Sequence, residues 1–84
     1  MSYSARVNVM LKSGIADPQG QTIERALPAL GYTGVTGVRV GKIIELHVDA
    51  ADETEARRRV DEMCERLLAN PVIESYEVTI GDPG

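Results

Sequence analysis

The chain has 84 residues, of which 43% are hydrophobic and 26% charged, and its formal net charge is −4. This length predicts one domain with a thin core, and this composition excludes a disordered chain. No apolar run approaches the roughly 20 residues that span a bilayer, and an acidic chain with three Tyr and no Phe or Trp is unlike a nucleic-acid-binding protein. We expect a single domain over residues 1–84, with residues 81–84 as a frayed tail.

Charge is distributed unevenly along the chain. Residues 1–42 carry a net charge of +3, whereas residues 43–84 carry −7. This difference in charge between the two halves suits a protein that binds another protein or a copy of itself, although a solvated surface would explain it too. The single cysteine, Cys64, cannot form an intramolecular disulfide, so we expect a reducing, cytoplasmic location.

The first third of the chain predicts a strand and then a helix. Residues 3–12 alternate apolar and polar side chains, which is the strand period. Asp17 can cap a helix that starts at Pro18, and Gly31 suits its left-handed end. Pro28 should kink the last turn. The apolar stripe of this helix consists of Ile23, Ala26, Leu27 and Leu30.

Residues 35–49 carry a second β pattern, in which the apolar residues share even positions: Val38, Val40, Ile44, Leu46 and Val48. We favour two strands that meet in a turn near Gly41, because a three-residue connection keeps these side chains on one face. A single long strand is the alternative, and its overhang would need another chain to pair with.

A second helix and a last strand complete the pattern. Asp52 can cap the helix, with Glu55 three residues later as in a capping box, and residues 72–80 form the strand. Arginines stand four residues after acidic ones, so we interpret the run at 57–59 as a neutralised helix surface. The apolar stripe of the helix consists of Ala56, Val60, Met63, Cys64, Leu67 and Leu68.

The resulting order, βαββαβ, predicts an α+β, ferredoxin-like fold. Right-handed crossovers would place both helices on one face of an antiparallel sheet. The open face and the edges of that sheet would then favour a homodimer or a larger assembly.

Few residues suggest catalysis. Cys64 falls on the apolar stripe of its helix, so we interpret it as a core residue and not as a nucleophile. His47 alternates with Glu45 and Asp49, but no nearby nucleophile and no further His or Cys ligand accompanies this row. We predict no catalytic residue and no metal site, and the role of His47 stays open.

Three segments of the chain carry a resemblance to a known family through their residues, order and spacing. They are residues 11–20 (LKSGIADPQG), residues 38–42 (VRVGK) followed by Glu45 and Leu46, and residues 64–74 (CERLLANPVIE). Together they resemble the PurS family, the small third subunit of bacterial and archaeal phosphoribosylformylglycinamidine synthase. The resemblance spans residues 5–80, and Pro28 is atypical of the family.

The resemblance implies a non-catalytic subunit of a ligase complex in de novo purine biosynthesis. It would bridge a glutaminase subunit and a large ATP-dependent synthetase subunit and assist ammonia transfer between them. ATP and Mg would be used by the synthetase, so no cofactor is expected in this chain. We also expect self-association, as a homodimer or tetramer, and neither a nucleic-acid nor a membrane partner.

Polar residues at element ends are the predicted docking surface, because such ends offer polar groups without disturbing the core. Within the three segments these are Asp17, Gln19, Arg39, Lys42 and Asn70. Asp17 could instead serve only as a helix cap. The alternative function is an ACT-like regulatory module, which shares the βαββαβ order and binds a small amino acid between subunits.

Overall fold

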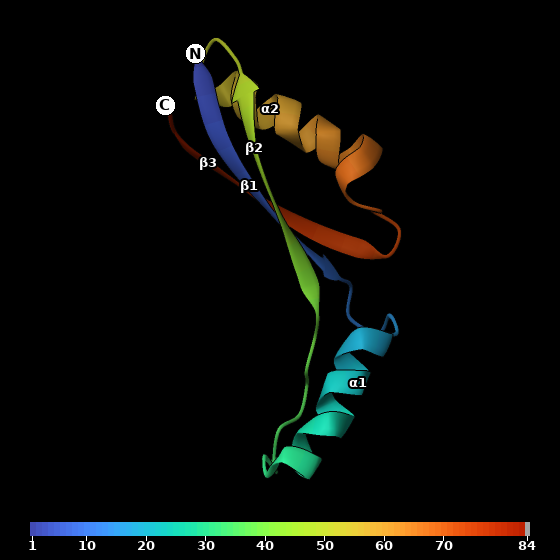
Figure 1. Cartoon of the computed structure of the whole chain (residues 1–84). Coiled ribbons are helices and arrows are strands. Elements are labelled where there is room, and N and C mark those ends of the chain that lie inside the picture. The colour runs from blue at the N-terminus through green and yellow to red at the C-terminus, as the bar shows by residue number, and fades with distance from the viewer. Residues whose placement is uncertain (84) are drawn as a thin grey trace.

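The computed structural model describes residues 1–83, and Gly84 lies outside the described residues. Three strands and two helices follow one another along the chain (Figure 1), and short 3₁₀ and π turns extend the two helices. The elements are β1 (Ser2–Leu11), α1 (Pro18–Ala26), the 3₁₀ turn η1 (Leu27–Leu30), β2 (Gly41–Asp49), α2 (Glu53–Met63), the π turn η2 (Cys64–Leu68) and β3 (Glu74–Pro83).

The strands form one antiparallel sheet in the order β2-β1-β3. Val7 in the centre of β1 pairs with Ile44 of β2 and with Val78 of β3, so apolar side chains share one face. This order is the one that the first, third and fourth strands take in a βαββαβ sheet. The α+β class and the ferredoxin-like order are therefore confirmed, although two details differ.

The first difference is that the chain does not turn at Gly41, so the predicted pair of strands meeting there is wrong. Residues 35–40 are unpaired and run into β2 without reversing (Figure 1), which is nearer to the single-strand alternative. The reversal lies earlier, where Gly34 and Gly37 have φ of +79° and +71°, a region that favours glycine. Gly41 serves close packing instead, because a Cβ there would lie 2.6 Å from the carbonyl oxygen of Val9.

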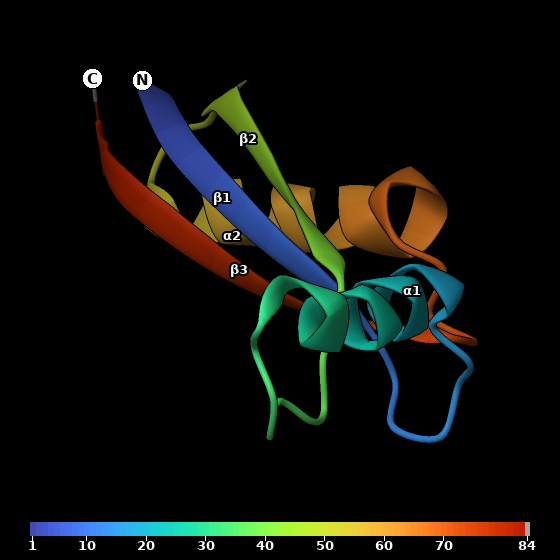
Figure 2. The ribbon, with the colours of Figure 1, turned by 60° about the horizontal axis from the view of Figure 1, so that its bottom comes forward.

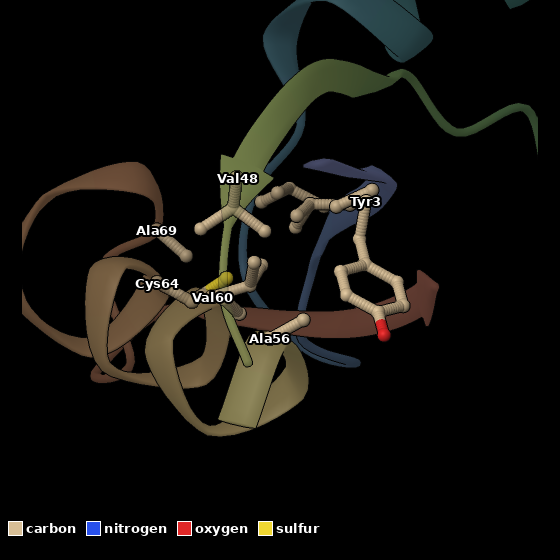
Figure 3. Close-up of a cluster of buried hydrophobic side chains, with 10 residues drawn as sticks. Tyr3, Val48, Ala56, Val60, Cys64 and Ala69 are labelled. Carbon is tan, nitrogen blue, oxygen red and sulfur yellow. The ribbon is translucent and has the colours of Figure 1, made fainter. Parts of the chain in front are cut away.

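The core lies between the sheet and α2 (Figure 3). β1 contributes every second side chain, and α2 contributes residues three to four apart, which confirms both periodicities. Asp52 caps α2 by accepting the Glu55 N–H at 2.8 Å, as predicted. The buried hydrophobic residues are Tyr3, Ala5, Val7, Val9, Val48, Ala50, Ala56, Val60, Cys64 and Ala69.

The second difference concerns α1, which lies beyond one end of the sheet and not on its face (Figure 1). Figure 2 shows that α2 crosses one side of the three strands. Of the two helices expected on one face, only α2 is there, because residues 35–40 do not fold back to extend the sheet under α1. Ile23 and Leu30 of the α1 stripe are consequently 43% and 72% exposed.

The molecule is elongated for its length. Its Cα radius of gyration is 16.6 Å, whereas a compact domain of this size has about 12 Å. Its accessible surface is 5892 Å², against about 4,900 Å² for a compact monomer of this mass.

Residues 81–83 continue β3, with Pro83 paired to Tyr3, so the predicted frayed tail is wrong for them. No helix in the described part of the chain is long and apolar enough to cross a membrane.

Candidate functional site

The candidate site is the junction between the end of β1, the start of α1 and the segment that precedes β2. The chain leaves β1 through a loop in which Gly14 has a φ of +86°, and α1 then starts with Pro18 in its first turn. The Asp17 side chain oxygen Oδ1 accepts the N–H of Gly20 at 3.0 Å, which is the predicted helix cap. The helix cap that the sequence predicts at Asp17 is therefore confirmed.

The second oxygen of Asp17 has a function that the sequence did not reveal. Its Oδ2 accepts the N–H of Val40 at 2.8 Å, across 23 positions of the chain. The N–H groups of Gly20 and Val40, with a smaller contribution from the Arg39 guanidinium, hold the pKa of Asp17 below its usual range against the opposing effect of burial. The carboxylate thus joins the start of α1 to the segment before β2.

A second carboxylate of α1 acts in the same way. Oε1 of Glu24 accepts the N–H of Val38 at 3.0 Å, so alternate backbone N–H groups of residues 38–40 are bound by the side chains of Glu24 in α1 and of Asp17, the N-cap of α1. Gly20 permits this approach, because a Cβ there would lie 2.6 Å from the Val38 carbonyl oxygen. Sequence reasoning missed Glu24, since no local pattern signals a bond between a helix and a segment beyond its end.

Four of the five predicted docking residues line two neighbouring grooves, each of about 440 Å³. Asp17, Gln19 and Lys42 line the first, together with Glu74, which is not among the predicted docking residues. Arg39 lines the second, with Asp17 and the loop after β1. The Arg39 guanidinium also donates to the carbonyl oxygen of Leu11, which ties the segment back to β1.

Asn70 lies apart from these four residues, in the turn between η2 and β3. Its Oδ1 accepts the N–H of Val72 at 3.1 Å, and its own N–H donates to Glu74 Oε1 at 2.6 Å. Asn70 therefore shapes a turn and reaches the first groove only through Glu74.

Two residues that could have suggested catalysis or metal binding, Cys64 and His47, lie outside the junction grooves. Cys64 is fully buried in the core, and this burial, together with the charges of Asp61 and Glu65, raises the pKa of its thiol. His47 is exposed on the open face of the sheet, opposite Ser4 in the register. Among residues 1–83, no three His, Cys, Asp or Glu side chains lie close enough together to hold a metal ion.

Comparison with known proteins gives consistent matches. A family model described as PurS, phosphoribosylformylglycinamidine (FGAM) synthase, matches residues 4–82. The PurS subunit of phosphoribosylformylglycinamidine synthase from a Synechocystis strain is 48% identical over 75 residues, which are 89% of this chain and 75% of that protein. The PurS subunit from Methanocaldococcus jannaschii is 42% identical over 78 residues, which are 93% of this chain and 94% of that protein.

Solved structures agree with these relatives. The crystal structure of Methanocaldococcus jannaschii PurS, a subunit of formylglycinamide ribonucleotide amidotransferase in the purine biosynthetic pathway, matches with a TM-score of 0.85 and 40% identity over 98% of this chain and 99% of that one. A chain of PurLQS from Thermotoga maritima matches with a TM-score of 0.86 and 39% identity over 95% of this chain and 98% of that one.

The fold and the junction define a small α+β module that displays polar groups on shallow grooves, a class of protein suited to binding other proteins. The chain belongs to the PurS family and is a subunit of phosphoribosylformylglycinamidine synthase (EC 6.3.5.3), an enzyme of purine biosynthesis. The resemblance seen in the three segments is confirmed, and the ACT-like alternative is not favoured.

Proposed function

We propose that the chain bridges the glutaminase and the large ATP-dependent synthetase of its complex and assists the passage of ammonia between them. The observation that carries this proposal is the junction, where Asp17, Gln19 and Lys42 line one groove beside the projecting α1. The match to a chain solved in PurLQS supports an assembly with other subunits.

The shape of the molecule suits a bridge. Its extents are 52 × 27 × 14 Å, with α1 near one end and the termini at the other (Figure 1). A thin body of this kind presents two separated surfaces, each large enough to contact a different partner. Neither surface requires a deep cavity, because the chemistry takes place in the partner subunits.

The proposed docking groups are those of the junction, together with Asn70. Lys42 is exposed and takes part in none of the ion pairs among residues 1–83, so its charge remains available to an acidic partner. Arg39 is likewise exposed, and Asp17 and Gln19 complete the polar lining. Asn70 would act by holding Glu74 at the edge of the groove.

We also propose that the chain associates with copies of itself, as a homodimer or tetramer. The apolar stripe of α1, with Ile23 and Leu30, is uncovered, and Tyr32 beyond it is 61% exposed. The segment of residues 35–40 has no strand partner among residues 1–83. A second copy could cover the stripe and pair with this segment, which would account for the large exposed surface.

ATP and Mg are assigned in this proposal to the synthetase, and no cofactor to this chain. The cytoplasm is the proposed location, because Cys64 is free and buried and such thiols persist in reducing compartments. The assignment of ATP and Mg follows from the role of a scaffold that acts beside the catalytic subunits.

Co-purification with the two catalytic subunits, in glutamine and Mg-ADP, tests the proposal. We expect a ternary complex and glutamine-dependent synthesis only when the chain is present. For the isolated chain, light scattering should give a mass above that of a single copy. The matched control is the same mixture without the chain. Full assembly and full glutamine-dependent synthesis in that control would contradict the proposal, and tight binding of a free amino acid would favour the ACT-like alternative.

A further inference from the structure

A second surface of the molecule shares no lining residue with the grooves of the junction and lies on the exposed side of α2 and η2. A groove of about 500 Å³ lies there, and its lining combines cations with aliphatic side chains. The residues that matter to the argument are Arg58, Arg59, Glu62, Met63, Arg66 and Leu67. We call this surface the α2 groove.

The α2 groove is positively charged although the chain as a whole is acidic. One carboxylate, Glu62, is shared by Arg58 at 3.5 Å and Arg66 at 3.4 Å. Arg59, which also lines the groove, donates to the carbonyl oxygen of Asp49. Three arginines and one glutamate leave an excess of two positive charges, within a half of the chain whose net charge is −7. The predicted neutralisation of these arginines is therefore incomplete.

The π turn explains how an aliphatic side chain comes to lie at this surface. The N–H of Ala69 donates to the Cys64 carbonyl oxygen at 3.1 Å, five residues back, so the turn is wider than an α-helical one. The sequence pattern predicts Leu67 in the core stripe, yet it is 83% exposed, whereas Leu68 packs against the core. Of the two leucines predicted in the stripe, the wide turn therefore leaves only Leu68 against the core.

Contacts from β3 hold the π turn in place. The hydroxyl of Tyr76 donates to Glu65 Oε1 at 2.7 Å, and Ala69 is buried directly after the turn. The exposure of Leu67 is therefore a feature of the ordered fold and not of a loose helix end. Leu67 and Met63 therefore form an ordered aliphatic lining between the cations of the α2 groove.

We propose that the α2 groove binds an acidic, aliphatic segment of a catalytic subunit, with a carboxylate against Arg58 and Arg66 and an aliphatic side chain against Leu67 and Met63. This partner rests on the proposed function, but the surface is separate from the junction. A second copy of the chain fits poorly, because a two-fold contact through this groove would bring the arginines of both copies together.

The test measures the affinity of the chain for each purified catalytic subunit. Two changes address the groove, Leu67→Asp and the double change Arg58→Gln, Arg66→Gln. Val72→Asp is the matched control, because Val72 is 80% exposed but lies outside the groove. We expect both groove variants to weaken binding to one catalytic subunit by about tenfold or more, and the control to stay within about twofold of the parent.

Several outcomes would overturn the proposal. Parental affinity in both groove variants would remove the groove from the interface, as would an equal loss in Val72→Asp. A lower mass of the isolated groove variants in light scattering would make the groove a contact between copies. If the parent chain binds neither catalytic subunit, the proposed function itself fails, whereas loss of the groove effect alone leaves that function intact.

Discussion

The carboxylate of Asp17 binds the backbone N–H of Val40 at 2.8 Å, and this bond joins the first helix to the segment that leads into β2. The other oxygen of the same carboxylate caps α1 through Gly20. One side chain therefore sets both the start of the helix and the path of the chain that returns from it. The docking surface proposed at the junction depends on this geometry.

Replacing Asp17 by Ser should separate the two functions of its carboxylate. A serine hydroxyl can still cap α1, but it is too short to reach Val40 as well, whereas Asp17→Ala loses both bonds. We expect amide hydrogen exchange at Val40 to accelerate in both variants and exchange at Gly20 to accelerate only in the alanine variant. Asp52→Ser is the control, because Asp52 caps α2 without a second bond in the junction. Continued protection of Val40 in Asp17→Ser would contradict this assignment.

The hydrogen bonds of the Asp17 carboxylate predict that the free energy of unfolding depends on pH. The pKa of Asp17 is lower in the folded chain than its ordinary value of 3.8, so its contribution to stability is fully present above that value. The contribution is lost as the pH falls through the lower, folded pKa. The difference in unfolding free energy between the parent and Asp17→Ala should therefore be constant from neutral pH to about pH 4 and shrink below it. Denaturation curves at several pH values measure it, and a constant difference down to pH 2 would refute the prediction.

Removing the charges of Arg39 and Lys42 should impair assembly more than folding. Both side chains are exposed, and exposed cations add little to stability. The melting temperature of Arg39→Ala, Lys42→Ala should therefore fall by only about 4 °C, mostly through loss of the Arg39 bond to the Leu11 carbonyl oxygen. We expect weaker assembly and slower glutamine-dependent synthesis, with a smaller loss when ammonia is supplied. Arg25→Ala is the control, since Arg25 is exposed on α1 but lines neither groove of the junction. Parental assembly of the double variant would show that these cations do not dock a partner.

Replacing Cys64 by Ala should lower stability without affecting the reaction. The thiol is fully buried and burial raises its pKa, so it is protonated and packed against the sheet. We expect a loss of about 1 kcal/mol of unfolding free energy, measured by chemical denaturation, from a small core truncation. Glutamine-dependent synthesis by the assembled complex should be unchanged. A loss of activity with normal folding and assembly would mean that the thiol has a chemical role.

Tyr76 should titrate separately from an ordinary phenol. Its hydrogen bond to Glu65, followed by burial, raises its pKa to about 12 from 10.0. Because the folded pKa is the higher one, the contribution of this bond is present below pH 10 and is lost as the pH rises through about 12. The ultraviolet titration curve of Tyr76→Phe should therefore lack a step near pH 12 that the parent shows. If the variant instead lacks a step near pH 10, Tyr76 titrates as an ordinary phenol in the parent and the bond to Glu65 does not form.

Much of the fold was predictable because it depends on local periodicity. Alternation along β1 and the apolar stripe of α2 identify the residues that form the core, since each pattern places its apolar side chains on one side of one element. The caps at Asp17 and Asp52 were equally local, because a cap joins a side chain to a backbone group three residues away.

What the sequence by itself determined is thus the two helices, three of the four predicted strands, their order, the α2-facing core and, through three short segments, the family. Only the tertiary structure decided that residues 38–40 lie on α1, through Asp17 and Glu24, and do not turn back at Gly41. It also decided that α1 projects from the sheet and that Leu67 leaves the core at the π turn. These features depend on hydrogen bonds and packing between distant positions, which no local spacing of residues encodes.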